Sequence, residues 1–156
     1  MAFESTRRGG SHDGHEARHA AEVDNAWITE VLSADGYTVR PGTQDVNNIL
    51  AEHPSRPNVT IRVHPELGLI TIVQLWGLKK GGGFGAHKNL MEKLNKANSQ
   101  SWRDTYYITT EGDLGVSSYI TLADQLSAED ITAHLARESE GFFTTVTVAG
   151  LREHLA

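Results

Sequence analysis

The sequence predicts an α+β domain in which an antiparallel sheet of two hairpins is flanked by helices. Two pairs of segments alternate apolar and polar residues around turn sequences, which is typical of hairpins. Three other segments repeat apolar residues every three or four positions, which is typical of amphipathic helices. With 156 residues, of which 38% are hydrophobic and 22% charged, the chain can bury one continuous core. The expected order is helix, optional short strand, hairpin, helix, hairpin, helix.

The first 18 residues differ in composition from the rest of the chain. They are rich in Gly, Ser, His and charged residues and show almost no apolar periodicity. Burial therefore cannot offset the entropy of ordering them. We expect residues 1–18 to form a flexible His-rich tail and residues 19–156 to form a single domain.

The first helix is expected directly after this tail. Its apolar residues at helical spacing are Val23, Trp27, Ile28, Val31 and Leu32. It should end at Asp35-Gly36, where glycine permits a left-handed stop. Residues 37–39 are compatible with a short strand before the Pro41-Gly42 break, and residues 45–53 fit either a helical turn or a loop.

The two hairpins give the clearest pattern. In the first, residues 59–64 alternate, a Pro-Glu-Leu-Gly turn follows, and residues 69–76 return as a strand. In the second, residues 105–110 are joined by a Glu-Gly-Asp turn to residues 114–122. Because the 69–76 strand is apolar on both sides, we expect it at the centre of the sheet, with part of both faces covered. The sheet should have four or five strands.

A middle helix joins the hairpins and a long helix ends the domain. The middle helix has one stripe formed by His87, Leu90, Met91, Leu94 and Ala97. The last helix begins with a sequence that resembles a capping box, Ser127-Ala128-Glu129-Asp130. Its apolar residues at helical intervals are Ile131, Leu135, Phe142 and Val146. Gly141 and the β-branched run at 144–148 favour a break within it.

Charge and composition exclude several classes of function. The net charge of -6 is spread along the chain and disfavours a surface for nucleic acid. The absence of cysteine excludes disulfides and thiolate metal sites, and it favours a cytoplasmic protein. The longest apolar stretch, at residues 67–73, is too short to cross a membrane, and the N-terminus has no apolar signal region. No cofactor is expected.

Several segments between Leu94 and Leu135 form a recognisable pattern: Leu94-Asn95-Lys96-Ala97-Asn98, the strand with Tyr106-Tyr107-Ile108, the turn Glu111-Gly112-Asp113-Leu114, and the Ser-capped helix that follows. Through these segments, and through the order of its elements over residues 20–150, the chain resembles the YbjN-like family of bacterial proteins. That family is described as sensory transduction regulators with a fold similar to type III secretion chaperones. The resemblance implies helices mainly on one side of the sheet, a homodimer, and a role in holding or regulating other proteins. It implies no catalytic residue.

The boundary of the tail contains a match to the zinc-protease motif H-E-x-x-H, at His15-Glu16-Ala17-Arg18-His19. Such chemistry needs both imidazoles on one face of a rigid helix and a third ligand. Here the motif adjoins a glycine-rich tail, so a metal-dependent hydrolase is an alternative and not the main hypothesis. If the first helix extends back, His12, His15 and His19 are spaced to bind zinc or nickel incidentally.

A glycine run precedes the middle helix and suggests a second alternative. Free backbone N–H groups and the helix dipole there can attract an anion, which would make the chain a small-anion sensor. The residues proposed for this site are Lys80, Gly83, Gly85 and Lys88. The run lacks the Gly-Lys-Ser/Thr ending of a nucleotide P-loop, and a plain flexible connection explains it equally well.

Aromatic residues on or beside the sheet are the main candidates for function. Large aromatic side chains fill cores or anchor interfaces, and a sheet with helices on one side leaves its other face to be covered. The candidates for partner binding are Trp76, Trp102, Tyr106 and Tyr119. The main hypothesis is a non-catalytic protein-binding or chaperone-like regulator that uses this face or the cleft between sheet and helices.

Overall fold

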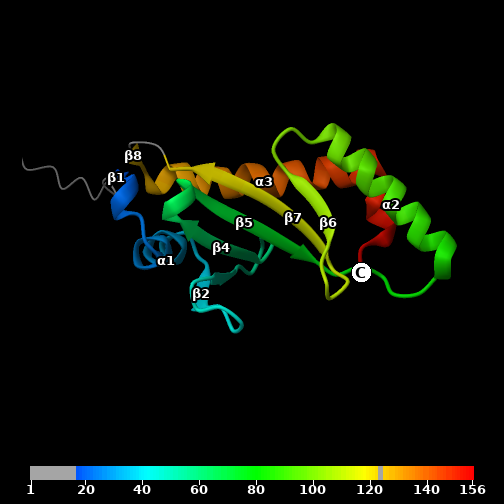
Figure 1. The fold of residues 1–156 in the computed structure, drawn as a ribbon, viewed down its shortest axis with the longest axis horizontal. Helices are drawn as coiled ribbons and strands as arrows, with labels where there is room; N and C mark the ends of the chain where they lie inside the picture. The colour runs from blue at the N-terminus through cyan, green and yellow to red at the C-terminus, as the bar shows by residue number, and fades with distance from the viewer. Residues whose placement is uncertain (1–16, 123–124) are drawn as a thin grey trace, which may run out of the picture.

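The computed structural model describes residues 17–122 and 125–156. The helices are α1 (Asn25–Ala34), α2 (Gly83–Gln100) and α3 (Ala128–Ala149), with short 3-10 turns at Ala20–Glu22, Pro65–Leu67 and Leu151–His154. The strands are β1 (Arg18–His19), β2 (Thr38–Pro41), β3 (Ile49–Glu52), β4 (Val59–His64), β5 (Leu69–Trp76), β6 (Thr105–Ile108), β7 (Leu114–Thr121) and β8 (Gln125–Leu126). Figure 1 shows α3 running behind the strands, with α1 and α2 toward opposite ends.

Six strands form one antiparallel sheet in the order β2-β3-β4-β5-β7-β6. Both predicted hairpins are present, as β4–β5 and β6–β7, and β5 lies at the centre as expected. The predicted α+β class with an antiparallel sheet and flanking helices is confirmed.

A third hairpin, β2–β3, enlarges the sheet beyond the four or five strands expected. Its second strand, β3, lies in the segment that the sequence left open between turn and loop. The connection is closed by local polar contacts: the Asp45 carboxylate accepts a hydrogen bond from Asn47 N at 2.9 Å, and Gly42 N donates to Asn48 O at 2.8 Å. These Asx-type contacts turn the chain within a few residues.

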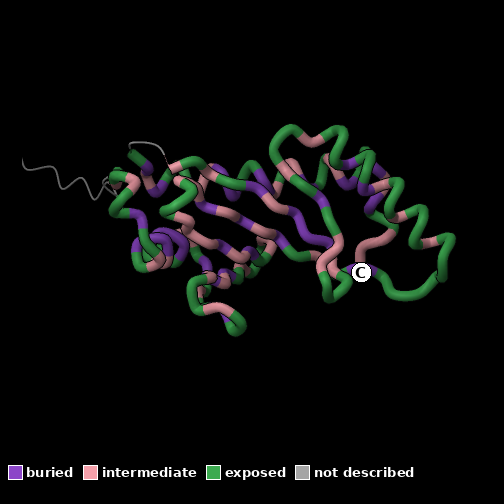
Figure 2. Tube along the Cα trace, viewed as in Figure 1, coloured by how far each residue is buried: buried purple, intermediate pink, exposed green. Residues whose placement is uncertain are grey.

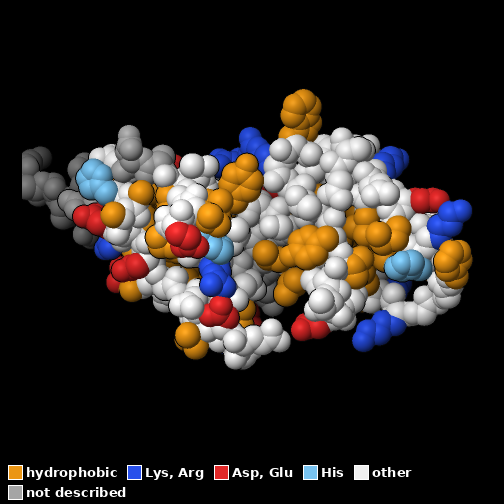
Figure 3. Space-filling model, in the orientation of Figure 1, with side chains coloured by type: hydrophobic (Ala, Val, Ile, Leu, Met, Phe, Trp, Pro, Cys, Tyr) orange, Lys and Arg blue, Asp and Glu red, His pale blue; other side chains and the backbone are white. Residues whose placement is uncertain are grey.

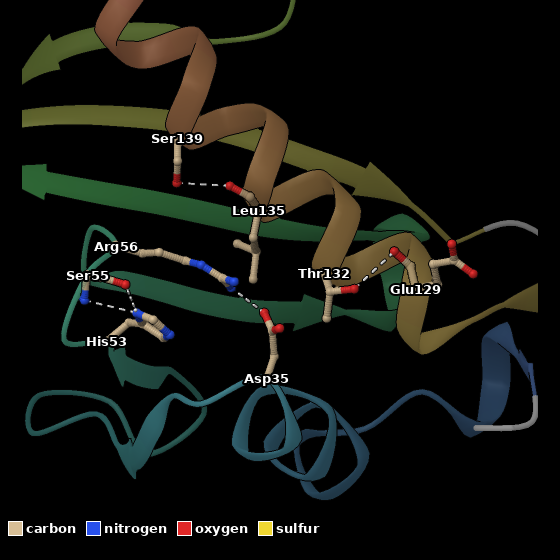
Figure 4. Close-up of polar contacts among 8 residues, drawn as sticks. All are labelled: Asp35, His53, Ser55, Arg56, Glu129, Thr132, Leu135 and Ser139. Carbon is tan, nitrogen blue, oxygen red and sulfur yellow. Dashed lines mark hydrogen bonds and ion pairs between the residues drawn. The ribbon is translucent and has the colours of Figure 1, made fainter. Parts of the chain in front are cut away.

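Helix α3 is continuous through Gly141, so the expected break is wrong. Its N-terminus has the predicted capping box: Ser127 Oγ accepts from Asp130 N, and the Asp130 carboxylate accepts from Ser127 N. Burial of one apolar stripe along the whole helix outweighs the strand preference of the β-branched residues. Hydroxyls along α3 bond back to carbonyls of the preceding turn, as Ser139 does to Leu135 and Thr132 to Glu129 in Figure 4.

The core lies between one face of the sheet and the helices. One cluster packs α1 and the start of α3 against β3, β4 and β5, and a second packs α2 and the end of α3 against β6 and β7. Figure 2 shows buried residues along the central strands and mostly exposed ones along α2. Since all three helices pack on this face, the expectation that β5 is covered on part of both faces is wrong.

Ion pairs and short strand pairings connect segments at the two ends of the fold. Arg56, between β3 and β4, forms an ion pair with Asp35 at the end of α1 (Figure 4). Arg18, which the sequence placed in the tail, lies in β1 and pairs with Leu126. At the other end, Leu155 pairs with Leu78 after β5 and Lys93 of α2 forms an ion pair with Glu153, so the C-terminus closes the second cluster.

Candidate functional site

The face of the sheet opposite the helices carries a group of apolar and aromatic side chains. Register places them on one side, because Leu75 and Tyr107 both lie opposite Gly115, and Val73 and Tyr119 share the parity of Leu75 and Gly115 along their strands. We call Val73, Leu75, Tyr107 and Tyr119 the open-face patch. Figure 3, in the orientation of Figure 1, shows hydrophobic side chains gathered where β5, β6 and β7 run together.

The open-face patch is shaped by one glycine. A Cβ atom at Gly115 would lie 2.6 Å from the Tyr107 ring, so the ring rests directly on the Gly115 backbone. Only glycine allows this close approach between a side chain and a strand. Toward β4 the same face becomes polar, with the Arg62–Asp45 ion pair at 2.8 Å and a hydrogen bond between His64 and Thr71 at 3.0 Å.

Two of the four predicted partner-binding aromatics do not point outward. Tyr106 is only 2% exposed and belongs to the second core cluster, where burial raises the pKa of its hydroxyl to about 12. Trp76 stacks on Phe142 of α3 with ring centroids 4.0 Å apart and planes 6° apart. Both side chains lie on the helix-covered face because they alternate with Leu75 and Tyr107 along their strands. The expectation that these two residues form the open surface is therefore wrong.

The other two predicted aromatics are exposed. Tyr119 is 61% exposed and belongs to the open-face patch. Trp102 is 99% exposed in the connection between α2 and β6. Both side chains are therefore accessible, and their role in partner binding stays a prediction.

A polar pocket opens beside Trp102, at the edge of the sheet where β6 begins. Its volume is about 720 Å³. It is lined by the connection from α2 to β6, by β7 and by α3, including Trp102, Arg103, Asp104, Tyr119, His134 and Arg137. Two hydrogen bonds between the Asn98 side chain and the Tyr106 backbone, at 2.9 and 2.7 Å, fix β6 to α2 and hold one wall in place.

Buried polar groups lie around His134, which is one of the residues that line this pocket. His134 is nine-tenths buried, and its Nε2 lies 3.0 Å from Ser118 Oγ and 3.7 Å from Glu138 Oε1. Burial, followed by the nearby Arg137 guanidinium, lowers the pKa of His134, so its imidazole is neutral at neutral pH.

Glu138 is 5% exposed, although it is an acidic residue in the middle of a helix. Burial raises its pKa to about 8, and a hydrogen bond with the Asp104 carboxylate adds to this shift. Asp104 Oδ1 is also buried, and no N–H or hydroxyl of the described residues donates to it. A protonated Glu138 is therefore the donor that the Asp104 carboxylate requires.

Ser118, His134 and Glu138 are close together but are not arranged as a catalytic triad. A triad needs the serine and the carboxylate on different ring nitrogens, so that the carboxylate orients the base. Here both Ser118 and Glu138 approach Nε2. Ser118 is itself buried within β7.

The structure adds little support for the anion site at the glycine run or for the metal site at the histidines. Helix α2 begins at Gly83 within the glycine run and no side chain caps it, while Lys88 lies 4.0 Å from Glu92 as an ion pair. His12 and His15 lie outside the described residues, and His19 lies in β1 and not on a helix. Within residues 17–122 and 125–156 no three His, Asp or Glu side chains are grouped to hold a metal ion. Anion binding at Lys80, Gly83, Gly85 and Lys88 stays a prediction.

Sequence reasoning missed the polar pocket, although one signal pointed to it. The buried stripe of α3 contains Ile131, Leu135 and Phe142, and Glu138 occupies the position between Leu135 and Phe142 on the same face. An acidic residue within an apolar stripe indicates a buried carboxyl group with a specific partner. The partner itself, Asp104, follows a helix more than thirty residues earlier and has no local pattern.

Together these features define a small α+β domain with helices on one face of its sheet, a partly apolar open face, and a polar pocket at the sheet edge. The chain belongs to the YbjN family: the family model, described as "Putative bacterial sensory transduction regulator", matches residues 24–140. The resemblance seen in the sequence is thereby confirmed. No curated protein matches the chain.

The fold is similar to a solved structure, the crystal structure of E. coli YbjN, "a putative transcription regulator". The two share 11% sequence identity with a TM-score of 0.61, over 84% of this chain and 94% of that one. At this identity the comparison shows the shared fold. Among the described residues, no helix is both long and apolar enough to cross a membrane.

Proposed function

We propose that this chain is a non-catalytic regulatory domain that binds a protein partner through the open-face patch. The observation that carries the proposal is the bare face of a six-stranded sheet whose three helices all pack on the other side. The description of the family as a regulator agrees with a binding role.

The composition of the patch suits a protein interface. Interfaces place aromatic and aliphatic side chains at the centre and polar groups around them. Tyr107 on β6 and Tyr119 on β7 supply large rings, Val73 and Leu75 lie on β5 beside β7, and the Arg62–Asp45 ion pair lies on the polar side. Since Tyr107 is seated on Gly115, its ring is positioned before a partner arrives, which reduces the entropy lost on binding.

A quantified pull-down from native cell lysate tests this function. We expect the double variant Leu75→Ser/Tyr119→Ser to lose a partner protein that the unchanged chain retains, with at least tenfold less bound, because two apolar anchors are removed. Both side chains are exposed, so the variant should remain folded, which circular dichroism can check.

The matched control is Leu67→Ser/Phe84→Ser, which removes two exposed apolar residues outside the open-face patch. It should retain the partner. Equal losses in both variants, or no loss in the patch variant, would argue against the open face as the binding surface. Sedimentation of the purified chain shows separately whether a second copy of the chain is the partner.

A further inference from the structure

The polar pocket has features that binding through the open-face patch does not explain. We infer that it is a binding site for a small aromatic anion, whose carboxylate or phosphate is held by Arg103 and Arg137 and whose ring lies against Trp102. This site goes beyond the proposed function and can fail or succeed independently of it.

The two arginines are available for a ligand. Both line the pocket, and neither forms an ion pair or side-chain hydrogen bond with any residue that the structure describes. Guanidinium groups bind carboxylates and phosphates through parallel N–H donors. One comes from the α2–β6 connection and the other from α3, so an anion bound to both would bridge two separate elements.

The charge balance of the pocket lining favours an anion, because two of its side chains are basic and one is acidic. The acidic residue of the lining is Asp104, whereas Glu138 lies outside the lining and burial raises its pKa to about 8. His134 is neutral because burial lowers its pKa. Two arginines against one carboxylate leave a net charge of +1, while the whole chain has a net charge of -6.

A buried and incompletely bonded side chain faces this pocket. His134 is nine-tenths buried and lines the pocket, and its Nε2 is occupied by Ser118. Its Nδ1 makes no hydrogen bond with the described residues, so one ring nitrogen remains for a polar group of the ligand.

The pocket also offers an aromatic surface and enough room. Trp102 and Tyr119 both line the pocket, and the Trp102 ring is fully exposed to solvent. An aromatic ring placed against Trp102 would remove apolar surface from water and stack in an offset or edge arrangement. The volume of about 720 Å³ lies within the range of small-molecule sites.

Binding of benzoate and of adenosine 5′-monophosphate, measured by calorimetry at millimolar concentration, tests this site. Benzamide and adenosine serve as the uncharged counterparts. We expect at least one of the two anions to bind and its uncharged counterpart to bind at least tenfold more weakly. Binding of benzoate alone would identify a carboxylate ligand, and binding of adenosine 5′-monophosphate alone a phosphate ligand.

Two double variants decide where the anion binds. Arg103→Ala/Arg137→Ala should weaken binding at least tenfold, since both guanidinium contacts are lost. Lys80→Ala/Lys88→Ala removes the same number of positive charges at the glycine run and should leave binding unchanged. The inference is overturned if neither anion binds, or if binding is lost in the lysine variant and retained in the arginine variant.

Discussion

Replacing Phe142 with alanine is expected to lower the free energy of unfolding by about 3–5 kcal/mol. Phe142 is 1% exposed, stacks on Trp76, and contacts the ring of Phe143 with centroids 5.5 Å apart. It joins the end of α3 to β5 within the second core cluster, so its removal leaves a cavity that rigid elements on both sides cannot close.

Urea unfolding followed by circular dichroism measures this effect. The matched control is Phe143→Ala, which changes the same residue type at the next position of the helix, where the side chain is 58% exposed. This substitution should lower the free energy of unfolding by about 1 kcal/mol or less. Similar losses from the two substitutions would mean that Phe142 is not the packing contact between α3 and the sheet.

The second large effect concerns pH. In the folded chain the pKa of Glu138 is raised from its usual 4.5 to about 8, mainly by burial. Between pH 4.5 and about 8 the folded state holds a proton that the unfolded state has released. The free energy of unfolding is therefore highest below pH 4.5 and falls as the pH rises toward 8. One such proton gives a slope of at most about 1.4 kcal/mol per pH unit. Glu138→Gln should remove this slope and be more stable than the unchanged chain at pH 9.

Glutamine is the informative replacement because its amide can still donate to the Asp104 carboxylate. Asp104, Arg103 and Arg137 are the charged groups that influence the pKa of Glu138. The neighbouring His134 has a lowered pKa, which makes the free energy of unfolding rise with pH and so opposes the effect of Glu138. These groups are present in both proteins, so the difference between the two unfolding curves from pH 5 to 9 isolates Glu138. Glu140→Gln, at an exposed position of α3, should keep the slope. An unchanged slope in Glu138→Gln would mean that Glu138 is ionised in the folded chain.

Local patterns sufficed for much of the fold. Strand alternation with turn residues identified β4–β5 and β6–β7, and the capping sequence at Ser127 identified the start of α3. The β3 strand was missed because it has four residues and its register depends on β4, which lies further along the chain. The break expected at Gly141 did not occur because burial of Phe142 and Val146 decides the conformation there.

The candidate surfaces depend on contacts between elements that are far apart in the sequence. Alternation along β6 and β5 fixes only that neighbours point to opposite faces, and it cannot say which face the helices cover. Tyr106 and Trp76 were therefore assigned to the wrong face, while Tyr119 was assigned correctly to an exposed one. The pocket needs Asp104 and Glu138 to meet across two elements, which only the packing of α3 against β6 brings about.

Photo-crosslinking in the cell tests the central claim that the open face is the surface for a partner. The crosslinking residue p-benzoylphenylalanine is placed at position 119, on the open face, or at position 143, on the exposed side of α3. These positions replace aromatic residues of similar exposure, 61% for Tyr119 and 58% for Phe143. We predict a covalent adduct with a protein chain from position 119 and none from position 143. An adduct from position 143 alone, or from neither position, would contradict the claim.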